Sequence, residues 1–183
     1  MLILASASPR RRELLSLAKL EFSVCPAKDE KNPQNTLPPA EYAVQSALFK
    51  AREVAKTHKD DTVLGADTVV FANGEIMGKP KTKAQAKEML RALSGRAHKV
   101  CTGYAIIKGG AEHTGCVVTD VYFRSLTERE IEDYVATGEP MDKAGAYGIQ
   151  EWIGYVGCIG LHGSYYNVMG LPVQSIYSEL LTL

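Results

Sequence analysis

Short strand-like apolar segments alternate along this chain with longer segments of helical periodicity, and this alternation restricts the fold more than any other feature. The segments expected to form strands are 2–5, 22–25, 62–72, 99–107 and 116–123. Helices are expected from Pro9, from Pro39 or Ala40 to about His58, over 82–93 with Thr82 as N-cap, from a cap at Ser125 or Thr127 through Val135, and after Pro172. The alternation predicts an α/β fold with a mixed, twisted sheet and flanking helices. Residues 137–170 are rich in Gly and are expected to be irregular.

Charge, hydropathy and cysteine use exclude several classes of protein. Lys and Arg number 21, as do Asp and Glu, and a general nucleic-acid-binding protein would show a basic excess. No apolar run approaches the roughly 20 residues of a membrane span, and no signal peptide precedes the first strand. The four Cys residues form no Cys-x-x-Cys pair. We therefore expect a single soluble domain over residues 1–183, without nucleic-acid or membrane partners, in the reducing cytoplasm.

The segment Ser6–Arg12 (SASPRRR) combines hydroxyls with three arginines. Ser8 suits a helix N-cap and Pro9 suits the first helical position. Arginines in the first turn are repelled by the positive end of the helix dipole. A bound anion would make their position favourable. The segment is consistent with a phosphate site and also with a solvated basic turn. It is not a Walker loop, because the Gly-Lys-Ser/Thr signature is absent.

Two further segments place single charged residues beside turns. Asp67 ends a buried strand and is followed by Thr68. An Asp at the edge of a sheet can hold a metal or orient a water molecule, and the alternative role is to form a turn. Lys79, between Gly78 and Pro80, is either a phosphate-binding point charge or a surface lysine. The same ambiguity applies to Lys50 in the long helix.

The segment Gly138–Gln150 (GEPMDKAGAYGIQ) is rich in small residues that permit close approach to a ligand. Gln150 carries a donor and an acceptor, as reading a base edge requires, although an ordinary surface loop has the same composition. His98 is a candidate catalytic group, but a hydrogen-bonded structural histidine is the preferred interpretation.

Taken in order, these segments resemble the Maf family of nucleotide pyrophosphatases. The matching segments are 6–11 (SASPRR), 65–68 (GADT), 78–80 (GKP), 94–98 (SGRAH), 138–150 and 167–172 (NVMGLP). Each is weak alone, and their shared order across the chain makes the match specific. The sequence departs from the usual pattern at Glu151, where many relatives have Gly.

The resemblance implies two lobes around a deep nucleotide-binding cleft, as in related ITPase-like folds, often in a homodimer. It implies hydrolysis of a nucleoside triphosphate to the monophosphate and pyrophosphate, with magnesium or manganese as cofactor. Asp67 would be the general base and, with Glu30, a metal ligand. The phosphates would be held by Ser6, Ser8, Arg11, Lys50 and Lys79.

Base choice follows from the branch of the family that the chain resembles. Arg10, Thr68 and Gln150 match positions that mark the pyrimidine-selective branch, so dTTP, UTP and modified pyrimidine nucleotides are the expected substrates. The alternatives are a 7-methyl-GTP pyrophosphatase and a non-catalytic nucleotide-binding regulator of cell division. A kinase-like phosphotransferase is disfavoured, since no kinase Gly-rich loop is present.

Overall fold

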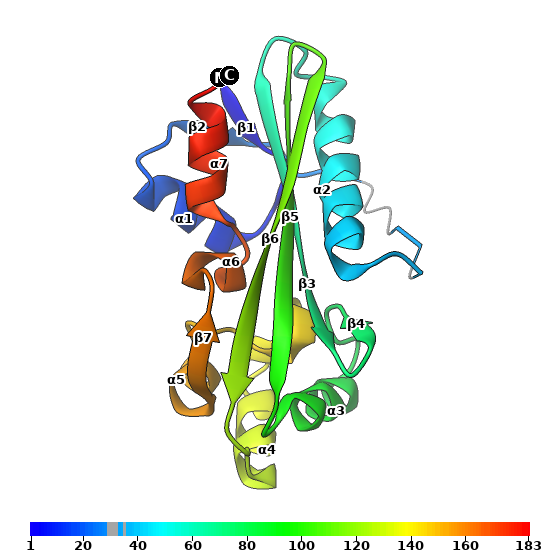
Figure 1. The fold of residues 1–183 in the computed structure, drawn as a ribbon, viewed down its shortest axis with the longest axis vertical. Coiled ribbons are helices and arrows are strands. Elements are labelled where there is room, and N and C mark those ends of the chain that lie inside the picture. The colour runs from blue at the N-terminus through cyan, green and yellow to red at the C-terminus, as the bar shows by residue number, and fades with distance from the viewer. Residues whose placement is uncertain (29–32, 35) are drawn as a thin grey trace. The chain divides into compact units, whose positions relative to one another are not determined.

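The computed structural model describes residues 1–28, 33–34 and 36–183, and Figure 1 shows their arrangement. The strands are β1 (Leu2–Leu4), β2 (Phe22–Val24), β3 (Thr62–Ala72), β4 (Glu75–Met77), β5 (Ala97–Lys108), β6 (Ala111–Phe123) and β7 (Cys158–His162). The helices are α1 (Pro9–Leu17), α2 (Pro39–Ala55), α3 (Lys83–Leu93), α4 (Glu128–Ala136), α5 (Trp152–Gly157), α6 (Tyr165–Met169) and α7 (Val173–Leu180). Two short 3₁₀ helices cover Glu139–Asp142 and Ala144–Ala146.

Among the described residues, the strands form one seven-stranded mixed sheet. The order is β2-β1-β3-β5-β6-β7, and β4 pairs with β3. Strand β1 runs parallel to both β2 and β3, whereas β4 and β7 pair antiparallel with β3 and β6. The expected α/β fold with a mixed sheet and flanking helices is confirmed.

The prediction that residues 137–170 are irregular is wrong for their second half. This half contains α5, β7 and α6. The periodicity of these elements is interrupted by Gly154, Gly157 and Gly160. At Gly154 the interruption is required, because an added Cβ would collide with the carbonyl oxygen of Ile149. Apolar periodicity does not report such a contact, so it gives no signal for α5.

Local signals at the helix N-termini agree with the structure. Ser8 lies at the N-cap of α1 and Pro9 at its first position, although the Ser8 side chain makes no capping hydrogen bond. The Thr82 hydroxyl accepts a hydrogen bond from the Gln85 amide at the start of α3. Thr127 and Glu130 form a reciprocal capping box at the start of α4. These short-range contacts are set by neighbouring residues, which is why they can be predicted from sequence.

The described chain divides into two compact units, consistent with the two lobes that the resemblance implied. Unit 1 contains residues 1–68, 102–117 and 170–183, and unit 2 contains residues 69–101 and 118–169. The deep cleft between lobes stays a prediction. Within the described ranges, no helix is both long and apolar enough to cross a membrane.

The core of unit 1 lies between α2 and the strands. Ala47, Ala51 and Val54 of α2 pack against residues of β1, β3 and β5, including Ile3 and Val63. In Figure 1, α2 lies on one side of these strands, and α1 and α7 lie on the other. Close packing requires Gly103, where an added Cβ would collide with the α2 backbone at Ala43 and Val44. Helix α2 is thereby held directly against the sheet.

Unit 2 has its own core, built from α3, α4 and the segment 141–153. Leu90 and Leu93 of α3 and Ile131 and Tyr134 of α4 are fully buried, and they pack with Tyr147 and other apolar residues. The Gly-rich segment singled out in the sequence is therefore part of a packed core, even though its composition resembles that of a loop.

Candidate active site

In unit 1, the Arg11 guanidinium ties together residues that are far apart in the sequence. It donates hydrogen bonds to Ser6 Oγ (Nη1, 3.1 Å), Thr68 Oγ1 (Nη2, 3.3 Å) and the Gly170 carbonyl oxygen (Nε, 2.8 Å). Residues Leu2–Leu4 of β1 pair in parallel with Thr62–Leu64, the first residues of β3, so the segment after β1 runs beside the continuation of β3. This topology brings Ser6 and Thr68 to the same cation. Arg11 is only 9% exposed.

The residues bonded to Arg11, together with their neighbours, form a cluster. This cluster contains residues that were not identified from the sequence. The Thr68 and Thr102 hydroxyls lie 2.9 Å apart, and Thr102 is fully buried in β5. Nothing in the sequence around Thr102 distinguishes it from other strand residues. Gly170, by contrast, belongs to the segment 167–172 that carried part of the family resemblance. The Ser8 amide also donates to Ser6 Oγ at 3.3 Å, so both predicted serines lie in this cluster.

Lys50 and Asp67 form an ion pair in unit 1. Lys50 Nζ donates to Asp67 Oδ1 at 2.6 Å, joining α2 to β3. Their side chains are 12% and 20% exposed, so both charges are largely withdrawn from water yet remain reachable. Burial raises the pKa of Tyr42, and the nearby Asp67 carboxylate raises it further. The pair gives Asp67 a fixed position with an adjacent positive charge, which suits a base acting beside an anionic substrate.

The donor chemistry at Asp67 fits a divalent metal that arrives with a triphosphate. Magnesium prefers oxygen ligands and is often held by one or two carboxylates, with substrate phosphates and water completing the shell. In the part of the chain that the structure describes, no cluster of three or more His, Cys, Asp or Glu side chains could hold a metal by itself. Glu30, the second predicted ligand, lies outside the described residues.

The remaining predicted site residues are divided between the two units. Arg10 is half-buried in the first turn of α1 in unit 1. Lys79 is exposed after β4 in unit 2, where the Gly78 carbonyl oxygen accepts from the Gly145 amide. Gln150, also in unit 2, is half-buried, and its buried Oε1 has no hydrogen-bond partner among the described residues. A buried acceptor without a partner is costly, so a donor from a ligand would stabilise it.

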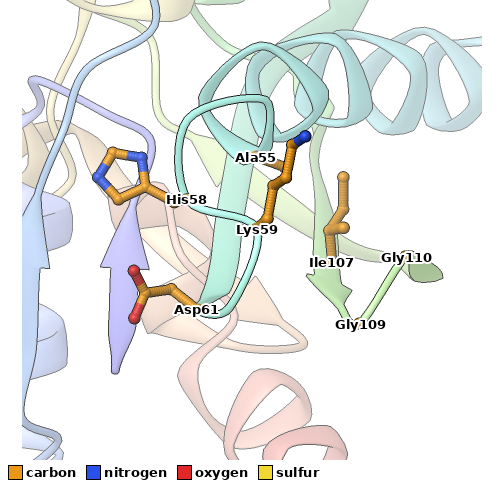
Figure 2. A pocket seen from close by; sticks show the side chains of 7 residues that line it. All are labelled: Ala55, His58, Lys59, Asp61, Ile107, Gly109 and Gly110. Atoms are coloured by element: carbon orange, nitrogen blue, oxygen red, sulfur yellow. The ribbon is translucent and has the colours of Figure 1, made fainter.

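A cavity of about 400 Å³ lies elsewhere in unit 1, and Figure 2 shows the residues around it. Its lining comes from the end of α2, the loop before β3 and the turn between β5 and β6. It is lined by Ala55, His58, Lys59, Asp61, Ile107, Gly109 and Gly110. None of the described candidate residues lines this cavity, so it is not the candidate active site.

His98 is buried in unit 2, and its surroundings support the structural interpretation. It is 3% exposed, and its Nε2 lies 2.7 Å from the Tyr147 hydroxyl. The ring packs edge-on against Phe123 and Tyr147. Burial lowers the pKa of His98 from 6.5 to about 4, so the imidazole is neutral at pH 7.

This pKa shift predicts a pH-dependent stability. Between pH 6.5 and 4 the unfolded chain takes up a proton that folded His98 does not. The free energy of unfolding should therefore fall as the pH falls through this range, by about 3 kcal/mol in total from this group. Urea unfolding at several pH values should show a shallower fall for His98→Gln than for wild type. The exposed His162→Gln variant should keep the wild-type slope, and an unchanged slope in His98→Gln would contradict the assignment.

Comparisons with known proteins agree with these observations. A family model described as Maf-like protein matches residues 1–183. A protein named dTTP/UTP pyrophosphatase from Thermococcus kodakarensis is 50% identical, covering 97% of this chain and 94% of the relative. Proteins of the same name from Phocaeicola vulgatus and Moorella thermoacetica are 46% and 49% identical, covering 98% and 100% of this chain and 94% of each relative.

One solved structure supports the fold. A HAM1 protein from Coxiella burnetii superimposes with a TM-score of 0.56 at 18% identity, covering 100% of this chain and 98% of that one. At this identity the likeness concerns the fold alone.

Proposed function

Because this chain belongs to the Maf family, whose model spans residues 1–183, we propose that it hydrolyses dTTP and UTP to the monophosphate and pyrophosphate. The names of relatives 46–50% identical over nearly the whole chain support this activity. The observation that carries the proposal is the 2.6 Å Lys50–Asp67 pair, which puts a carboxylate base beside a cation in unit 1. We propose further that residues 1–183 form one functional domain that works in the cytoplasm as a homodimer.

Asp67 acts as the general base. It takes a proton from a water molecule whose oxygen bonds to the α phosphorus. The bond between the α phosphorus and the oxygen that bridges to the β phosphate breaks, and that oxygen leaves with pyrophosphate. Lys50 holds the Asp67 carboxylate in place and offsets the negative charge of the substrate. A divalent metal, magnesium or manganese, would be held by Asp67, with Glu30 as its second protein ligand, and would supply further charge stabilisation when bound.

The phosphates are held by Ser6, Ser8, Arg11, Lys50 and Lys79. A triphosphate carries several negative charges, and charge-assisted hydrogen bonds are the contacts that stabilise it most. The bonds from buried Arg11 to Ser6 and Thr68 support an additional role for Arg11, which is to fix these hydroxyls. A fixed donor loses less conformational entropy when substrate binds.

Gln150 reads the base, together with Arg10 and Thr68. The buried Gln150 Oε1 without a partner suits the N3–H donor of uracil or thymine. Cytosine presents an acceptor at N3 and would leave this oxygen unsatisfied. The positive charge of 7-methylguanine is unfavourable beside Arg10, which argues against the alternative substrate 7-methyl-GTP.

A panel of dTTP, UTP, CTP and 7-methyl-GTP tests the proposal. We expect kcat/KM for dTTP and UTP to exceed the other two at least about tenfold, because each unpaired buried polar group costs about 1–3 kcal/mol. Gln150→Ala should remove most of the preference for UTP over CTP without changing the metal dependence. A clear preference for 7-methyl-GTP would overturn the base assignment. Binding without any pyrophosphate release would favour the non-catalytic regulator.

A further inference from the structure

A buried cation in unit 2 lies close in sequence to Gln150. Lys143 is 6% exposed, and its Nζ donates to the Glu139 carbonyl oxygen at 2.5 Å and to Asp142 Oδ1 at 2.6 Å. It also contacts Glu151 Oε1 at 2.7 Å. The Asp142 side chain is 60% exposed, whereas the Glu151 side chain is 18% exposed. Because water screens the exposed pair, Glu151 is the more effective counterion for Lys143.

The second oxygen of Glu151 connects this pair to helix α4. The Tyr134 hydroxyl donates to Glu151 Oε2 at 2.5 Å, and the same hydroxyl accepts from the Gly148 amide at 3.3 Å. Tyr134 is 1% exposed, so the residue whose hydroxyl makes both bonds is buried in unit 2, while the Glu151 side chain is 18% exposed. The Glu151 carboxylate therefore accepts from two buried donors that come from different segments.

These contacts anchor both ends of one turn. The Glu151 amide donates to the Gly148 carbonyl oxygen at 3.1 Å, and Gln150 lies within the turn that this bond closes. Gly148 is held by Tyr134, while Glu151 is held by Tyr134 and Lys143. An added Cβ at Gly148 would lie 2.8 Å from Glu151 Cδ and 3.0 Å from Lys143 Cε, so the glycine lets both side chains close over the backbone.

We propose that Glu151 is a positioning residue for base recognition: its carboxylate, bonded to Lys143 and Tyr134, fixes the turn that presents Gln150 to the pyrimidine. This inference rests on the proposed function, in which Gln150 reads the base. A turn that samples other conformations would present Gln150 correctly for only part of the time. The apparent affinity for UTP would be the full affinity multiplied by the fraction of molecules in which Gln150 is correctly placed. The rate of the chemical step would change little.

Glu151→Gln is the first test, because it keeps the size but replaces one acceptor oxygen with a donor. Lys143 and Tyr134 contact different oxygens of the carboxylate, so the amide would place its NH₂ donor against one of these two donors. We expect KM for UTP to rise about tenfold and kcat to stay within about twofold. The preference for UTP over CTP should fall, and hydrogen exchange of the amides over 148–151 should accelerate. Tyr134→Phe removes the hydroxyl that bonds both Glu151 and Gly148, and it should cause a change of the same kind.

Two controls separate positioning from a general loss of stability. Glu128→Gln removes a carboxylate that bonds Arg91 at 2.7 Å on the surface of unit 2, and it should leave the preference unchanged. In a Gln150→Ala background, Glu151→Gln should cause no further loss of preference, since it acts through Gln150.

The outcomes distinguish this inference from the function on which it depends. A wild-type protein that hydrolyses no nucleoside triphosphate would overturn both. Wild-type activity, with an unchanged preference for UTP over CTP in both Glu151→Gln and Tyr134→Phe, would overturn the positioning role alone. A further loss of preference in the double variant would show that Glu151 does not act through Gln150 and would also overturn it.

Discussion

A folded Asp67→Asn variant is expected to hydrolyse UTP at least about a hundredfold more slowly than wild type. Asparagine keeps the size of the side chain and can still accept from Lys50, but it cannot take a proton from water. It also removes the negative charge that would hold a divalent metal. The measurement is kcat at saturating UTP and metal, with circular dichroism and urea unfolding to confirm that the variant is folded.

Glu112→Gln is the matched control for Asp67→Asn. Glu112 also lies in unit 1 and pairs with a cation of α2, at 2.7 Å from Arg52 Nε. Both variants remove a carboxylate that is bonded to the same helix, but only Asp67 lies beside the Ser6–Arg11 cluster through its neighbour Thr68. Glu112→Gln should keep near-wild-type turnover. Similar turnover in a folded Asp67→Asn variant would remove Asp67 from the catalytic role.

Gly103→Ala is expected to destabilise the protein by about 3 kcal/mol, the upper part of the range for overpacking a core. The new Cβ would collide with the α2 backbone at Ala43 and Val44, and a backbone cannot move aside as a flexible side chain can. Helix α2 would have to shift away from β5. The midpoint of urea unfolding should fall accordingly, and activity should fall with it, because α2 carries Lys50.

Gly78→Ala provides the comparison for this effect. An added Cβ at Gly78 meets no atom within 4 Å, so no neighbour has to move. Its free energy of unfolding should stay within about 1 kcal/mol of wild type. If Gly103→Ala were as stable as Gly78→Ala, the close packing of α2 against β5 would be wrong.

Features governed by neighbouring residues could be predicted from the sequence. The caps at Thr82 and Thr127 depend on contacts three residues apart, and the alternation of strands and helices follows from local periodicity. The strand β7 could not be predicted, because Gly160 interrupts its short apolar pattern and its place in the sheet depends on pairing with β6. Long-range packing therefore limited the prediction of the fold.

The candidate site was predictable in its residues but not in its contacts. Asp67 was identified as the end of a buried strand, although it lies inside β3, which continues to Ala72. Lys50, in the middle of a helix, had no distinguishing local signal apart from the family resemblance. Their pairing depends on how α2 lies against β3, which neither segment encodes alone. Glu151 was noticed only as a departure from the usual family pattern. Its pairing with Lys143 and Tyr134 depends on the turns between them.

The products of UTP hydrolysis test the central proposal most directly. Phosphorus NMR of the reaction with magnesium or manganese resolves pyrophosphate, orthophosphate, monophosphate and diphosphate in one sample. We predict that UMP and pyrophosphate accumulate in equal amounts from the first time point, and that chelation of the metal stops both. Initial formation of UDP and orthophosphate would show that a different bond is broken and would contradict the assignment.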